Sequence, residues 1–78
     1  MKTTEDIIKL ANYGIHLVTN AGSKSNDDLM QIAYIVNAKG THLTILQAYK
    51  KSTEDLKPIC QLLKEHLTLD FTERKVEG

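Results

Sequence analysis

The sequence predicts an α/β domain in which helices and strands alternate, α-β-α-β-α-β, giving a two-layer fold. A three-stranded parallel sheet carries all of the helices on one face. Two observations predict this fold: a short phrase recurs along the chain, and behind each copy the apolar spacing changes from helical to alternating. The three helix-strand repeats span about 2–21, 24–48 and 51–72 within a single domain of residues 1–72, and 73–78 is predicted to be a flexible tail.

The recurring phrase reads K-[ST]-[TN]-[DE]-D-[IL]-x-x-[IL]-[AC], and a tripeptide H-L-[VT] follows each copy. Three copies that agree at ten aligned positions indicate an internal repeat. The phrase begins at Lys2, Lys24 and Lys51, and the tripeptide begins at His16, His42 and His66.

Each phrase predicts the start of a helix. Ser or Thr followed three residues later by Asp approximates a capping box, and acidic residues suit the positive end of the helix dipole. Gly14 and Gly40 fall where the first two helices should end. The start of the third helix stays open because Pro58 disrupts a helix that begins at Ser52 but is harmless in one capped by Asp55.

Each tripeptide predicts the start of a strand, because the apolar period then changes to two, as in Leu67, Leu69 and Phe71. Strands joined through helices should be parallel, and the simplest strand order follows the chain. Alignment of the repeats predicts which residues are neighbours on the helix-facing side. They are Leu17, Leu43 and Leu67, followed by Thr19, Ile45 and Leu69.

The opposite face of the sheet is predicted to mix histidine, hydroxyl and aliphatic side chains, with Asn20 and Asp70 at its far end. This mixed composition fits either a solvated face or a partner that binds through a wet interface. Parallel sheets usually have both faces covered, which favours the partner. The candidate partner-binding residues are His16, Val18, His42, Thr44, Leu46, His66 and Thr68.

The sequence contains three other candidate sites, and for each of them a structural role is a simpler interpretation than a binding or catalytic role. The row of three histidines resembles a zinc site, but the outer two start about 9.6 Å apart and no carboxylate in the row completes the site. The turn 20–25 ends in Lys-Ser, yet it lacks the second glycine of a phosphate loop and precedes Asp27 and Asp28. Cys60 aligns with Ala11 and Ala33, which predicts an inert buried thiol.

Composition narrows the function classes. The 78-residue chain has ten basic and ten acidic residues, so it lacks the charge that nucleic-acid or membrane binding requires. The start of the chain lacks the pattern of a signal peptide, and the single cysteine excludes an internal disulfide. We therefore expect a cytoplasmic protein with no cofactor.

These observations favour a small non-enzymatic protein–protein interaction module of the inhibitor, immunity or adaptor type, because no catalytic triad or carboxylate pair is evident. Its open sheet face or edge is expected to bind a protein partner or a second copy, as in a homodimer. The alternative is a small ligand- or metal-binding domain that uses the strand-end loops or the row His16, His42 and His66.

Overall fold

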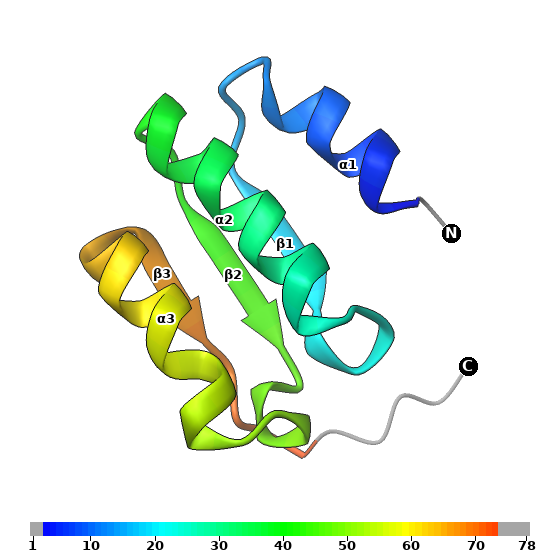
Figure 1. Cartoon of the computed structure of the whole chain (residues 1–78), viewed down its shortest axis with the longest axis vertical. Helices are drawn as coiled ribbons and strands as arrows, with labels where there is room; N and C mark the ends of the chain where they lie inside the picture. Colours follow the sequence, from blue (N-terminus) through cyan, green and yellow to red (C-terminus); the bar gives the residue numbers. More distant parts are fainter. Residues whose placement is uncertain (1–2, 74–78) are drawn as a thin grey trace.

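The computed structural model describes residues 3–73 and confirms the predicted alternation of helices and strands (Figure 1). The helices form one layer over a three-stranded parallel sheet of order β1-β2-β3. Short 3₁₀ turns occupy most of the junctions. In chain order the elements are α1 (Thr4–Ala11), β1 (Leu17–Asn20), η1 (Ala21–Ser23), α2 (Asn26–Lys39), β2 (Leu43–Leu46), η2 (Ala48–Lys50), α3 (Thr53–Leu63), η3 (Lys64–His66) and β3 (Leu67–Leu69).

The strand register is the one that the repeat predicts. Leu17 pairs with Leu43, and Leu43 pairs with Leu67. The next helix-facing row, Thr19, Ile45 and Leu69, pairs in the same way. A register shift of one residue would turn every side chain to the other face, so the repeat fixes which residues enter the core.

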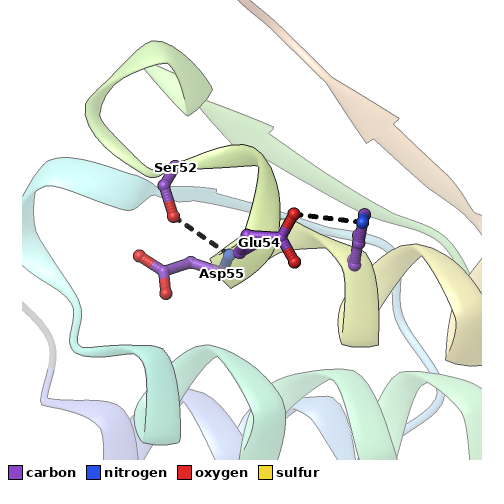
Figure 2. Close-up of polar contacts among 4 residues, drawn as sticks. Ser52, Glu54 and Asp55 are labelled. Atoms are coloured by element: carbon purple, nitrogen blue, oxygen red, sulfur yellow. Dashed lines mark hydrogen bonds and ion pairs between the residues drawn. The ribbon is translucent and has the colours of Figure 1, made fainter.

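All three helices begin at the same repeat position. The hydroxyls of Thr3, Ser25 and Ser52 accept the amide protons of Asp6, Asp28 and Asp55 at 3.2, 3.1 and 3.1 Å respectively. Figure 2 shows this contact at Ser52, which decides the open question about the third helix: Ser52 is the cap and Pro58 lies inside α3. The helix continues to Leu63 although Pro58 has no amide proton to donate.

The ends of the elements differ in part from the prediction. α2 ends at Lys39 and is capped by Gly40, which has the left-handed φ of 67° that glycine adopts without strain, as expected. α1 ends at Ala11, three residues before Gly14. The third strand ends at Leu69, short of Phe71, because the Asp70 carboxylate accepts the Thr72 amide at 2.9 Å and turns the chain.

The core lies between α2, α3 and β2. α2 and α3 supply most of its buried residues, whereas the one fully buried residue of α1 is Ala11. No helix within residues 3–73 combines the length and the apolar character needed to cross a membrane. Residues 74–78 of the predicted tail lie outside the described residues. The buried apolar residues of the main cluster are Ala21, Leu29, Ile32, Ala33, Val36, Leu43, Ile45, Ala48, Leu56, Ile59 and Leu63.

Candidate functional site

The candidate site is the helix-free face of the sheet, which we call the outer face. Successive residues of a strand point to opposite faces, so the residues between the buried leucines and isoleucine point away from the helices. Val18 is 67% exposed and Leu46 is 37% exposed, whereas Leu43 and Ile45 on the helix side are fully buried. By this alternation the outer face consists of Val18, Asn20, Thr44, Leu46, Thr68 and Asp70, and His16, His42 and His66 directly precede its three strands.

The histidines at the start of the strands are only partly brought together. The rings of His16 and His42 lie with their centroids 6.3 Å apart and their planes tilted by 57°. The Nε2 atom of His42 lies 2.7 Å from the Thr68 hydroxyl, a hydrogen bond that joins β2 to β3 across this face. His66 belongs to η3, immediately before β3. His42 is therefore the histidine that makes a polar contact to the neighbouring strand β3, and its ring also lies beside that of His16.

The metal-site interpretation lacks a ligand set in the structure. Among residues 3–73, no group of three or more His, Cys, Asp or Glu side chains is placed to hold a metal ion. One imidazole pair supplies two ligands, and a structural zinc site requires four. This geometry favours the interpretation of the histidines as surface residues beside the outer face.

The turn 20–25 uses its own polar groups internally. The Asn20 side-chain oxygen accepts the Gly22 amide proton at 2.8 Å, and the Ser23 hydroxyl donates to the Asn20 carbonyl at 3.2 Å. A phosphate loop needs such amides to point at the ligand. Gly22 instead serves close packing, because a β-carbon there would lie 2.8 Å from the Cδ atom of Lys50.

This turn shows a part of the repeat that the phrase above leaves out. Ala21 and Ala48 open the 3₁₀ turns η1 and η2, and both alanines are buried. Each is followed four residues later by the capping serine, Ser25 or Ser52. The shared pattern A-x-x-K-S is visible in the sequence, and it would have identified both turns as structural elements.

Cys60 differs from its prediction. Its repeat equivalents, Ala11 and Ala33, are buried, but Cys60 is only half-buried. Within the described residues, α3 is the last helix of the layer, so one of its sides has no neighbouring helix. The thiol therefore occupies a repeat position that is buried in α1 and α2 but only partly covered in α3.

Comparison of the chain with protein-family models, with curated proteins and with solved structures gives no match. The functional argument therefore starts from the geometry of the sheet.

Proposed function

We propose that this protein is a non-enzymatic protein–protein interaction module that docks its partner on the outer face. The observation that carries the proposal is the uncovered face itself, where Val18 and Leu46 expose aliphatic surface beside hydroxyl and imidazole groups. Parallel sheets are normally covered on both sides, so such a face is suited to a partner that covers it. An inhibitor, immunity or adaptor role in the cytoplasm fits this arrangement.

The chemistry of the outer face defines the kind of partner. Asp70 is its one carboxylate, and the remaining residues and the adjoining histidines offer hydroxyl, amide and imidazole groups around Val18 and Leu46. A surface of this composition matches the mixed polar and apolar character of non-obligate interfaces, in which water bridges many contacts. The partner surface should accordingly be weakly charged, with its own aliphatic centre and a polar rim.

The test uses a charge placed at the centre of the outer face. Thr44 lies on the middle strand, away from both sheet edges, and its side chain is half-buried. Thr44→Asp should abolish capture of a protein partner by the immobilised domain, because a carboxylate buried in an interface lacks compensation. The matched control is Tyr34→Asp on α2, a residue of the helix layer that is 58% exposed, and it should leave capture unchanged.

Equal capture by wild-type protein and Thr44→Asp would refute docking on the outer face. A rise in melting temperature with added zinc, lost in His42→Ala, would instead support the metal-binding alternative.

A further inference from the structure

The helix positions at the start of the repeat array are less buried than their equivalents. Leu10, Ile32 and Ile59 occupy the same position of the phrase, yet Leu10 is 43% exposed and the other two are 0% and 1% exposed. In Figure 1, α1 lies on the side of β1 away from β2, where no further strand or helix of residues 3–73 lies beside it. Leu10 is thus a core position whose neighbour is missing.

The edge of β1 offers hydrogen-bonding groups for such a neighbour. The Leu17 amide donates to the His42 carbonyl at 2.9 Å, so the backbone of Leu17 faces β2. Backbone groups of successive strand residues point to opposite sides, so the amide and carbonyl of Val18 point to the free edge. A strand edge with such outward-pointing amide and carbonyl groups is a template for pairing with another strand.

The free edge of β3 also presents backbone hydrogen-bonding groups, which can pair with those on the free edge of β1. The Asp70 amide donates to the Ile45 carbonyl at 2.9 Å, so the backbones of Thr68 and Asp70 face β2. The Leu67 carbonyl and both backbone groups of Leu69 therefore point outward, while the Leu67 amide donates to the Lys64 carbonyl. The side chains of Leu67 and Leu69 are only half-buried, although their equivalents on β2, Leu43 and Ile45, are fully buried. Within residues 3–73, the last strand therefore also lacks a neighbour on its outer edge.

We propose that copies of this chain assemble head to tail, with β3 of one copy pairing in parallel with β1 of the next. The register continues the internal one, so that Leu67, Thr68 and Leu69 pair with Leu17, Val18 and Thr19 of the second copy. The Val18 amide then donates to the Leu67 carbonyl, and the Leu69 amide donates to the Val18 carbonyl. α1 of the second copy covers the junction and buries Leu10 against the first copy.

The position of α1 selects this arrangement over a two-fold dimer. Each helix precedes its strand in the repeat, so α1 overhangs the free edge of β1. Pairing β1 with β1 would bring two α1 helices into the same space. Pairing β3 with β3 would leave Leu67 and Leu69 with no helix above the junction. Head-to-tail pairing places one helix over each junction, as α2 and α3 do within the chain.

Charge does not oppose this assembly, because the formal net charge of the chain is zero and copies do not repel one another over long distances. A heterologous contact of this kind closes into a ring or grows as an open array. The inference goes beyond the proposed function, since it uses the two sheet edges and α1 and leaves the outer face free for a different partner.

The experiment uses two variants: one blocks the β1 edge, called the head, and the other blocks the β3 edge, called the tail. The head-blocked variant combines Leu10→Lys with Val18→Pro, which removes an outward amide but no bond to β2. The tail-blocked variant is Leu69→Lys, with Leu67→Lys as its replacement if circular dichroism shows that Leu69→Lys is unfolded. Mass is measured by light scattering over a wide range of concentration, for each protein alone and for an equimolar mixture of the two blocked variants.

The measured mass of the wild-type protein should increase with concentration and exceed twice the monomer mass of 8.8 kDa. Each blocked variant alone should stay monomeric, and the mixture should form a one-to-one dimer, because each partner retains one functional end. A monomeric wild-type protein, or a mixture that remains monomeric, would overturn the proposal. Retention of a dimer by only one blocked variant would show a two-fold contact and would overturn it as well.

Thr44→Asp separates this inference from the proposed function. Its charge lies on the outer face of the middle strand, so head-to-tail growth should be unchanged while partner capture is lost. Loss of growth in Thr44→Asp would place the contact between copies on the outer face and would contradict edge pairing.

Discussion

The first and second repeats carry the same phrase but differ in how completely they are buried. Thr3 and Ser25 cap their helices through the same contact. Three positions of the α2 phrase, Leu29, Ile32 and Ala33, are buried completely, whereas α1 buries only Ala11 to that extent. The difference follows from neighbours, because α2 packs between α1 and α3, whereas within residues 3–73 α1 has a neighbouring helix, α2, on one side only. Local sequence therefore sets the elements, and position in the array sets their burial.

The largest effect should come from charge in the middle strand. Leu43→Asp places a carboxylate with no partner at a fully buried position, which costs more than about 4 kcal/mol and is comparable to the whole stability of a domain this small. The variant should be unfolded by circular dichroism. Thr44→Asp, one residue along on the outer face, should keep a cooperative unfolding transition. Unfolding by both substitutions would mean that the two faces of the sheet are equally buried.

Truncation to alanine at equivalent helix positions should lower the free energy of unfolding less in the first repeat than in the second. Ile32→Ala should lower the free energy of unfolding by about 3 kcal/mol, because the position is fully buried and a cavity remains. Leu10→Ala should lower it by less than about 1 kcal/mol in dilute solution, where this side chain stays partly exposed. Urea titrations of both variants measure the difference, and equal losses would contradict the role of neighbours.

A smaller effect distinguishes the ends of α2 and α3. The C-cap of α2 is Gly40, but the C-cap of α3 is Lys64 with φ 51° and ψ −116°, a conformation that is strained for a residue with a β-carbon. Lys64→Gly should therefore stabilise the protein by about 1 kcal/mol. The control Glu65→Gly, at an exposed neighbour without a positive φ, should destabilise it slightly. A shift in melting temperature of the same sign for both variants would argue against strain at Lys64.

Much of the fold could be predicted because the repeat encodes local rules three times. Capping at Thr3 and Ser25, the parallel register and the face assignment all follow from residue types within one unit. The cap of the third helix did not, because Pro58 left Ser52 and Asp55 as alternatives. The end of the third strand could not be read in the same way, since the alternating pattern continues to Phe71 and the Asp70 side chain decides the turn. The half-burial of Cys60 was also missed, because it depends on which helices are its neighbours.

The outer face could be predicted for a similar reason, since alternation along a strand determines which side chains share a face. Its details could not. The sequence places three histidines in equivalent positions, but the structure pairs His16 with His42 and directs His42 to Thr68. Side-chain rotamers decide these contacts, and the repeat phrase carries no information about them.

The central claim is that the first and last repeats are less buried because each lacks a neighbouring repeat. Amide hydrogen exchange at β1 tests this claim most directly. In dilute solution the Val18 amide, which faces the free edge, should exchange rapidly, and the Thr19 amide, which faces β2, should be protected. Raising the protein concentration should protect Val18 and Leu69 together and leave Thr19 unchanged, as head-to-tail pairing requires. Exchange at Val18 that is slow at every concentration, or that stays fast while Leu69 becomes protected, would contradict this account of the array.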